Sequence, residues 1–157
     1  MPDTLTETGQ TAPDFTLPRD DGAPVTLSAQ RPAPVVLYFY PKDDTSGCTK
    51  EAIAFSGLLA EFEATGARVF GISKDSLAKH GKFRSKHELS VPLLSDEDGD
   101  VCERYGVWVE KSMYGKRFMG IERATVLIDG TGRIARIWRK VKVPGHAEEV
   151  LEAVRAL

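Results

Sequence analysis

The sequence predicts an α/β fold in which a central mixed β-sheet is flanked by helices. The run 35–40 is continuously apolar and dense in β-branched and aromatic residues, which is typical of a strand buried on both faces, and 69–73 is expected to form a second buried strand. A helical pattern separates these runs, and a hairpin followed by a terminal helix ends the chain. The 157 residues fit one domain spanning 1–157.

The first elements are short strands that precede the sheet. Residues 1–34 are rich in Thr, Pro, Asp and Gly, and strand-like segments at 15–17 and 25–27 flank the turn Asp20-Asp21-Gly22. They predict an N-terminal strand or hairpin extension. The run 35–40 then forms the first buried strand.

A long helix is expected next, from Cys48 to about Ala64. Its apolar side chains recur at helical spacing, at Ala52, Phe55, Leu59 and Phe62. Gly66 suits the position just after the helix, where a left-handed backbone is common. The second buried strand, 69–73, follows it.

Asp75-Ser76 is expected to cap a second helix that runs to about His87. A short helix is expected at 101–105. The strands 124–128 and 134–138 flank a loop with two glycines, which predicts a hairpin.

The chain ends in an amphipathic helix with one apolar face, formed by Val150, Leu151, Val154 and Leu157. The complete order, β-α-β-α-(α)-β-β-α, is thioredoxin-like. In open sheets of this kind, sites form beyond the carboxyl ends of the parallel strands. Cys48 lies just after the first of those ends.

Composition excludes several classes of function. Lys and Arg number 21 against 23 Asp and Glu, so the net charge is −2 and no basic excess predicts nucleic-acid binding. The longest apolar stretch, 34–40, is too short to span a membrane. Met1–Glu7 is acidic and polar, unlike a secretory signal, so a cytoplasmic location is expected.

The two cysteines, Cys48 and Cys102, lie far apart and form no CxxC motif. Neither a zinc knuckle nor the usual dithiol-oxidoreductase motif is therefore expected. A static disulfide is not expected in a reducing cytoplasm, whereas a transient catalytic disulfide stays open.

Cys48 is the candidate nucleophile. A thiol at the start of a helix meets unpaired backbone N–H groups and the positive end of the helix dipole, which favour the reactive thiolate. The alternative is a buried cysteine without chemistry. The preceding residues argue against it, because they are turn and cap formers rather than core residues: Pro41, Asp43, Asp44, Thr45, Ser46 and Gly47.

Three residues are candidates to assist Cys48. Thr45, three residues earlier, is expected to place its hydroxyl beside the sulfur and a substrate oxygen. Pro41 would rigidify the loop and shield the thiolate. Arg123, just before the strand 124–128, is the best-placed cation, and a guanidinium favours a thiolate. By position alone, Arg123 also fits a solvated arginine at a strand end.

These residues carry a family resemblance. The spacing Pro41-x-x-x-Thr45-x-x-Cys48 resembles the active-site signature of the peroxiredoxins, and residues 38–49 resemble the peroxiredoxin Q, or bacterioferritin comigratory protein, subfamily. The resemblance spans nearly the whole chain. Further matching segments are Ala12–Phe15, Pro92–Asp96, Tyr105–Trp108, Gly120–Thr125 and Gly145–Leu151.

The resemblance implies a thiol-dependent peroxidase of thioredoxin fold that reduces hydrogen peroxide and small organic hydroperoxides. Cys48 would be the peroxidatic cysteine and would become a sulfenic acid. Thr45 and Arg123 would orient the peroxide, and Pro41 would shape the pocket. No metal, haem or other cofactor is implied. A thioredoxin-like protein or a small thiol would be the reductant, and a monomer is expected, with a transient disulfide dimer as the alternative.

The chain departs from the subfamily at its resolving cysteine. Many members carry this residue five positions after the peroxidatic one, where this chain has Ile53, or near Phe83-Arg84. Ser46 also replaces a frequent proline. Cys102 is therefore the only internal partner. It is interpreted as a structural thiol, which makes this a one-cysteine enzyme, or as a thiol that resolves after local unfolding or between chains.

Other functions remain as alternatives. A redox sensor or holdase would use Cys48 as a switch without turnover, a cysteine hydrolase would need a Cys–His pair that is not visible, and a fold relative could have lost activity.

Other motifs receive structural interpretations. His80, His87 and His146 lack metal-ligand spacing and are expected at the surface or at helix ends. The acidic cluster 96–100 is expected to be a solvated turn rather than a calcium loop. Trp108 and Trp138 are expected to pack on the core, and Trp108 is also a candidate to border the substrate entrance.

Overall fold

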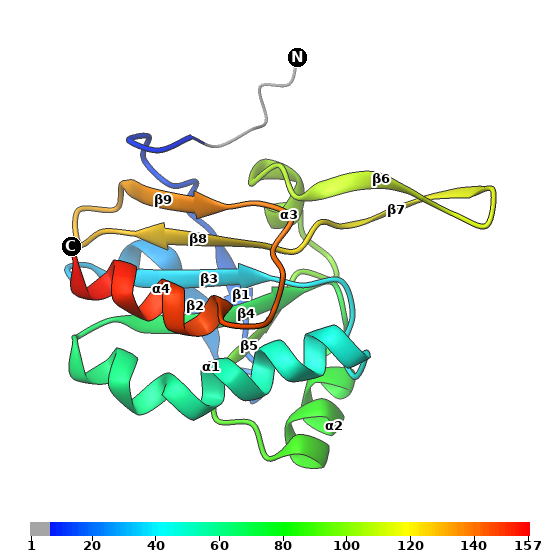
Figure 1. Ribbon diagram of the computed structural model, residues 1–157, viewed down its shortest axis with the longest axis horizontal. Helices are drawn as coiled ribbons and strands as arrows, with labels where there is room; N and C mark the ends of the chain where they lie inside the picture. The colour runs from blue at the N-terminus through cyan, green and yellow to red at the C-terminus, as the bar shows by residue number, and fades with distance from the viewer. Residues whose placement is uncertain (1–6) are drawn as a thin grey trace.

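The computed structural model describes residues 7–157, and at its centre lies a five-stranded sheet in the order β5-β4-β3-β8-β9 (Figure 1). Its strands are β3 (Val35–Phe39), β4 (Arg68–Ser73), β5 (Leu93–Ser95), β8 (Ala124–Ile128) and β9 (Ile134–Trp138). β3, β4 and β5 run parallel, whereas β8 and β9 join by antiparallel pairing. The predicted mixed sheet is confirmed. The expectation for Met1–Glu7 falls almost wholly on residues 1–6, outside the described residues.

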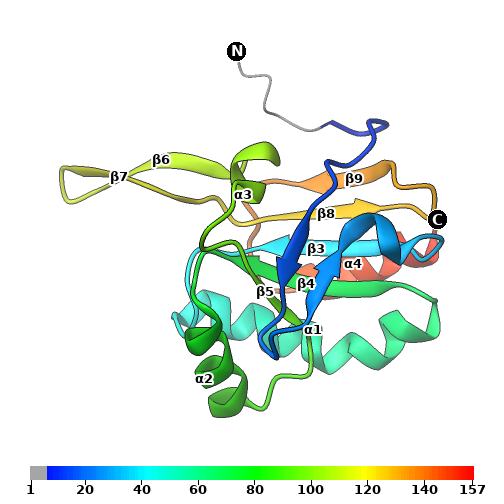
Figure 2. The same ribbon diagram turned by 180° about the vertical axis from the view of Figure 1, so that it is seen from behind.

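Helices cover the sheet on both faces. α1 (Ser46–Ala64) and α4 (His146–Arg155) pack side by side on one face, and α2 (Leu77–His87) lies beside them (Figure 1). The other face carries α3 (Val101–Arg104) and the N-terminal hairpin of β1 (Thr16–Pro18) and β2 (Pro24–Thr26) (Figure 2). A 3-10 turn, η1 (Leu27–Gln30), follows β2. No helix in the described chain is long and apolar enough to cross a membrane.

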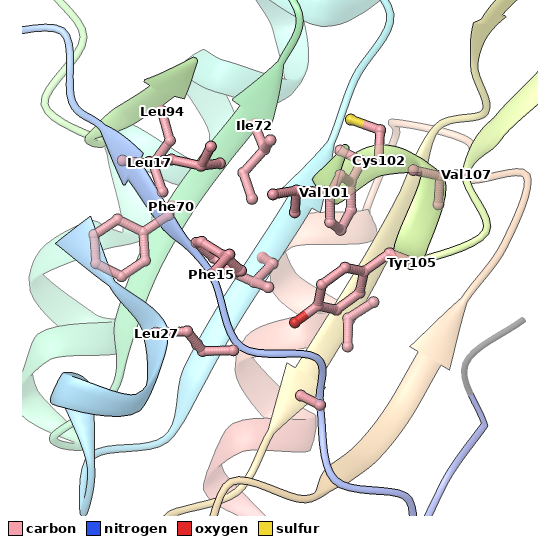
Figure 3. Packing of buried hydrophobic residues seen from close by; sticks show 14 of the residues in the cluster. Phe15, Leu17, Leu27, Phe70, Ile72, Leu94, Val101, Cys102, Tyr105 and Val107 are labelled. Atoms are coloured by element: carbon pink, nitrogen blue, oxygen red, sulfur yellow. The ribbon is translucent and has the colours of Figure 1, made fainter. Parts of the chain in front are cut away.

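The sheet separates two hydrophobic cores, because successive side chains of a strand point to opposite faces. Val35, Leu37 and Phe39 of β3 enter the core beneath the N-terminal hairpin and α3. Val36 and Tyr38 enter the core beneath α1 and α4. Figure 3 shows part of the first core, with Cys102 among the residues that line it. Cys48 belongs to the second core.

Most predicted elements are confirmed. β8 and β9 have the expected bounds, while α1 begins two residues before Cys48. Gly66 has a φ of +88°, as expected after a helix end. The Ser76 side chain accepts a hydrogen bond from the Lys79 backbone N–H, which caps α2. At the C-terminus the apolar face extends only to Val154. Leu157 follows the helix and is 55% exposed, so its expected burial is wrong.

Three strands were not expected. β5 has only three residues, and β6 (Trp108–Met113) and β7 (Lys116–Ile121) form a separate two-stranded ribbon that projects from the body (Figure 1). Most ribbon residues are half-buried or exposed. Their sequence therefore lacks the clear alternation of apolar and polar residues by which a strand is predicted. Its turn, Tyr114-Gly115, has positive φ at both residues, as a type I′ hairpin requires.

Two expectations about polar residues need correction. His80 is fully buried within α2 rather than at the surface or at a helix end, whereas His87 ends α2 and His146, although buried, begins α4 as expected. In the acidic turn, residues 97–100 are exposed as expected, but Asp96 is fully buried, because its carboxylate accepts hydrogen bonds from the backbone N–H groups of Val101 and Cys102. A carboxylate that accepts such donors is stabilised away from water.

Trp108 and Trp138 are both partly buried. Trp108 packs against the core that contains Cys102, and Trp138 against the other, as expected. The Lys74 ammonium also lies 5.0 Å from the centre of the Trp108 ring, a cation–π contact.

Candidate active site

Cys48 occupies the first turn of α1, the helix that follows the carboxyl end of β3. Thr45 is the N-cap residue, with an extended backbone at φ −89° and ψ 158°. The first turn of a helix has unpaired N–H groups and the positive end of the dipole, so it favours an anion there. The Cys48 side chain is only 1% exposed. The thiol is therefore held in a nearly dry environment next to this turn.

Arg123 is brought to Cys48 from the segment between β7 and β8. Its Nη2 donates to Cys48 Sγ at 3.3 Å, and its Nη1 donates to Glu51 Oε1 at 2.6 Å. Gly47 allows this approach, because a Cβ there would lie 3.1 Å from Nη2. Burial alone lowers the pKa of the Arg123 guanidinium, but the Glu51 and Cys48 charges raise it above its ordinary value. Arg123 therefore stays a cation beside the sulfur.

Glu51 is a member of the site that was not predicted from the sequence. It lies one turn after Cys48 on α1 and is 1% exposed. Burial raises the pKa of the Glu51 carboxyl to about 7, although the charge and hydrogen bond of Arg123 act in the opposite direction. Its Oε2 has no hydrogen-bond partner among the described residues. The i, i+3 spacing from Cys48, which places two residues on one helix face, was the available signal.

Thr45 and Pro41 lie in the loop that leads into α1. The Thr45 hydroxyl donates to the backbone carbonyl of Lys42 at 2.8 Å, so its proton is directed into the loop. The described structure has no hydrogen bond between this hydroxyl and Cys48 Sγ. Pro41 is half-buried at the start of the loop. Thr45 therefore precedes the helical turn that holds Cys48, but its hydroxyl is bonded to Lys42 and not, as had been expected, to the sulfur.

The loop is fixed to α2 by its two aspartates. Asp43 contacts His80, and Asp44 accepts from Lys86 Nζ and His87 Nε2, each at 2.8 Å. Asp43, His80 and Asp75 could also supply three metal-ligand atoms within 4.8 Å of one another. These side chains already hydrogen-bond to one another or to the loop backbone, so the cluster is a complete network without an ion.

Cys102 lies on the opposite face of the sheet from Cys48, in a fully buried position. Burial raises the pKa of the Cys102 thiol far above its ordinary value, and the Asp96 charge and hydrogen bond act in the same direction. A thiol in this setting is a poor nucleophile.

The two other resolving positions hold no thiol. Ile53 is 49% exposed on α1. Arg84 forms an ion pair with Asp20 and donates to the carbonyls of Leu89 and Val91.

Known proteins resemble this chain in both sequence and overall structure. The model of the AhpC/TSA family matches residues 8–137. A putative peroxiredoxin bcp from Coxiella burnetii is 52% identical over 145 residues, which cover 92% of this chain and 96% of that protein. A PrxQ mutant from Xylella fastidiosa has a TM-score of 0.91 at 42% identity, covering 96% of each chain. The bacterioferritin comigratory protein of Xanthomonas campestris, studied for alkyl peroxide reduction, has a TM-score of 0.88 at 43% identity, covering 98% of each chain.

Proposed function

This chain belongs to the AhpC/TSA family as a peroxiredoxin of the Bcp, or Q, type, and from that premise we propose that Cys48 is its peroxidatic cysteine. Peroxiredoxins are thiol-dependent peroxidases, so the chain is an enzyme that reduces peroxides with thiol electrons. The observation that carries the assignment of Cys48 is the 3.3 Å hydrogen bond from Arg123 Nη2 to its sulfur. A cation in direct contact favours the thiolate, which is the attacking species.

The Cys48 thiolate attacks one oxygen of the peroxide. An S–O bond forms while the O–O bond breaks, and the bonding pair leaves with the second oxygen. That oxygen takes up one proton and departs as water or an alcohol, and Cys48 becomes a sulfenic acid. The sulfur is oxidised by two electrons and the peroxide is reduced by two.

Arg123 is proposed to stabilise the charge that develops on the leaving oxygen. A fixed donor in a site closed to water is effective in this role, because it needs no reorganisation during the reaction. Glu51 holds the other end of the guanidinium and so sets its orientation. Thr45 and Pro41 are proposed to bound the peroxide on the loop side, with Thr45 turning its hydroxyl from Lys42 toward the substrate.

An external thiol is proposed to reduce the sulfenic acid. Cys102 is fully buried on the other face of the sheet, and positions Ile53 and Arg84 carry no thiol. A first external thiol would form a mixed disulfide with Cys48 and release water. A second thiol would then release reduced Cys48 and a disulfide of the reductant. This cycle needs only one cysteine of the enzyme.

The proposed substrates are hydrogen peroxide and small organic hydroperoxides, supported by the alkyl peroxide activity of the Xanthomonas campestris relative. The proposed reductant is a thioredoxin-like protein or a small thiol. We infer that the chain acts as a monomer in the cytoplasm, where both of its cysteines would stay reduced. A transient disulfide dimer, formed by resolution between two chains, is the alternative.

The intact mass after one equivalent of hydrogen peroxide tests this proposal. Fully reduced protein is mixed with peroxide without added thiol and measured under non-reducing conditions. We expect the gain of one oxygen atom in a monomer, located on Cys48 by peptide mapping. Sustained peroxide consumption on adding a thiol donor would separate an enzyme from a redox sensor that reacts only once.

Each other mass would contradict part of the proposal. Loss of two hydrogen atoms would indicate a disulfide between Cys48 and Cys102 and would refute the one-cysteine cycle. A doubled mass would indicate resolution between two chains. An unchanged mass would refute Cys48 as the peroxidatic residue.

A further inference from the structure

A buried histidine–aspartate pair joins the active-site loop to α2. His80 Nδ1, on α2, lies 2.6 Å from Asp43 Oδ2, in the loop five residues before Cys48. His80 is completely buried and Asp43 nearly so. Neither residue contacts the Cys48 sulfur in the described structure, so any effect on the reaction must act through the loop.

Asp43 fixes the loop through three hydrogen bonds. Its backbone N–H donates to Asp75 Oδ2 at 2.8 Å, and its Oδ1 accepts from the Tyr40 hydroxyl at 2.6 Å. Its Oδ2 contacts His80. Asp75 is itself held by the Ser73 hydroxyl at 2.7 Å. The ends of β3 and β4 and the start of α2 thus converge on this one loop residue.

The geometry fixes how many protons the pair holds. His80 Nε2 lies 2.9 Å from the Leu94 carbonyl, which only accepts hydrogen bonds, so Nε2 carries a proton. The contact between Nδ1 and Asp43 needs a second proton, shared between imidazole and carboxyl. Without it, a carboxylate would face a bare ring nitrogen at 2.6 Å.

The polar groups that face His80 are Asp43, Asp75, Tyr40 and the Leu94 carbonyl. Burial lowers the pKa of the His80 imidazole, but the hydrogen bond and charge of Asp43, with the contributions of Leu94 and Asp75, raise it above its usual value. A group whose pKa is raised by folding stabilises the fold at low pH and loses that contribution as the pH rises through its folded-state pKa. The pair therefore weakens as the pH rises through the pKa of His80.

The next loop residue shows that the loop needs such restraint. Asp44 adopts a left-handed backbone with φ of 61°, which costs free energy for a residue other than glycine. Lys86 and His87 of α2 hold its carboxylate at 2.8 Å, but these side chains are accessible to solvent. The His80–Asp43 contact is the inner of the two attachments and is shielded from water.

We propose that His80 is a positioning residue for peroxide reduction: through the proton it shares with Asp43, it holds the loop so that Cys48 stays beneath the Arg123 guanidinium. This inference rests on the proposed role of Cys48. It requires the attachment to be present at neutral pH and lost on the alkaline side, where the loop loosens and the reaction slows.

The test compares His80→Asn with His87→Asn, a matched control on the same helix that contacts the same loop from solvent. Two quantities are measured across pH in the full-length protein: the rate constant for hydrogen peroxide and the amide hydrogen exchange of residues 41–47. For the wild type we expect both the rate and the protection to fall at alkaline pH. His80→Asn should react roughly tenfold more slowly, show low protection throughout and lack the alkaline fall. His87→Asn should stay within about twofold of the wild type and keep that fall.

A second variant keeps the proposal testable if His80→Asn does not fold. In Asp43→Asn the amide can donate to a neutral His80 and its oxygen can still accept from Tyr40. The attachment then no longer needs the shared proton, so we expect loop protection to persist at alkaline pH.

Two results would overturn the proposal. One is a wild-type rate and protection profile in His80→Asn. The other is a lower melting temperature with an unchanged pH profile, which would show a structural role only. Because hydrogen exchange does not depend on turnover, loss of the loop attachment can be recognised even if Cys48 proves not to be the peroxidatic residue.

Discussion

The two cysteines sit in environments that are alike in burial and opposite in charge. Cys48 is 1% exposed and Cys102 is 0% exposed, and each lies in the first turn of a helix. The Arg123 guanidinium donates to the Cys48 sulfur at 3.3 Å. Around Cys102 the charged group with the largest influence is the Asp96 carboxylate, which accepts the Cys102 backbone N–H at 2.9 Å. The Lys74 ammonium, 3.3 Å from Asp96, acts on the thiol in the opposite direction but more weakly.

This difference shows that burial alone does not decide whether a cysteine is reactive. Burial disfavours any thiolate, and a neighbouring charge then adds to that effect or opposes it. At Cys102 the carboxylate adds to it, and the pKa of the thiol is raised far above its ordinary value. At Cys48 the Arg123 guanidinium opposes the effect of burial, because a cation favours the thiolate. The sign of the nearest charge therefore separates a candidate nucleophile from a structural thiol.

The largest expected effect on activity comes from replacing each of the two cysteines in a separate variant. Cys48→Ser should abolish peroxide consumption, because a serine hydroxyl is not ionised at neutral pH and does not attack peroxides. Cys102→Ala should keep activity within about twofold, with a stability loss of roughly 1 kcal/mol for the smaller side chain. Peroxide consumption with a thiol donor measures the first, and denaturant unfolding measures the second. An equal loss of peroxidase activity in both variants would contradict the proposed difference between the two cysteine sites.

Removing the cation beside Cys48 should have the next largest effect. Arg123→Met retains much of the side-chain volume but supplies no charge or donor, so the rate constant with hydrogen peroxide should fall by roughly 10²–10³. Stopped-flow kinetics measure this rate constant. Arg117→Met is the control, because Arg117 lies exposed on the projecting ribbon. An equal rate constant in the wild type and in Arg123→Met would show that Arg123 does not assist the reaction of Cys48.

The carboxylate behind the cation should have a smaller effect on rate and a distinct effect on stability. Glu51→Gln should slow the reaction only several-fold, since the amide oxygen can still accept from Arg123. Burial raises the pKa of Glu51 from 4.5 to about 7, so the wild type loses stability as the pH rises through that window. Between acidic and mildly alkaline pH, the free energy of unfolding of the wild type should fall by roughly 3 kcal/mol relative to that of Glu51→Gln.

Denaturant unfolding at several pH values measures this difference, with Glu61→Gln on the exposed side of α1 as the control. A pH-independent difference between wild type and Glu51→Gln would show that Glu51 ionises normally. The contrast between the two cysteine sites would then depend on Arg123 alone.

The central strands and long helices were predictable because their signals are local. The run 35–40 is apolar without interruption, and α1 has regular helical spacing with Gly66 at its end. The position of Cys48 followed from the same pattern, since the start of a helix after a buried strand can be located in sequence. Arg123 could be proposed from its place before β8, but its distance from the sulfur could not.

The remaining features depend on contacts between distant segments. β5 has three residues and is a strand only because it pairs with β4. The ribbon of β6 and β7 pairs with itself, and its turn uses Tyr114-Gly115 rather than the more familiar Asn-Gly. His80 was expected at the surface or at a helix end, and the partner that it meets in the interior, Asp43, is 37 residues away in the sequence. The one local signal was its i, i+3 spacing from Phe83, which places both side chains on the buried face of α2.

The complete burial of Cys102 behind the sheet also makes it an internal reporter of unfolding. A thiol-labelling reagent can reach this side chain only in molecules whose core has opened, so its labelling rate would follow the population of globally unfolded protein. Labelling of Cys48 would instead follow the much smaller opening of one loop and one helical turn. A single pulse of reagent, read by mass, would then measure local and global opening in the same molecule.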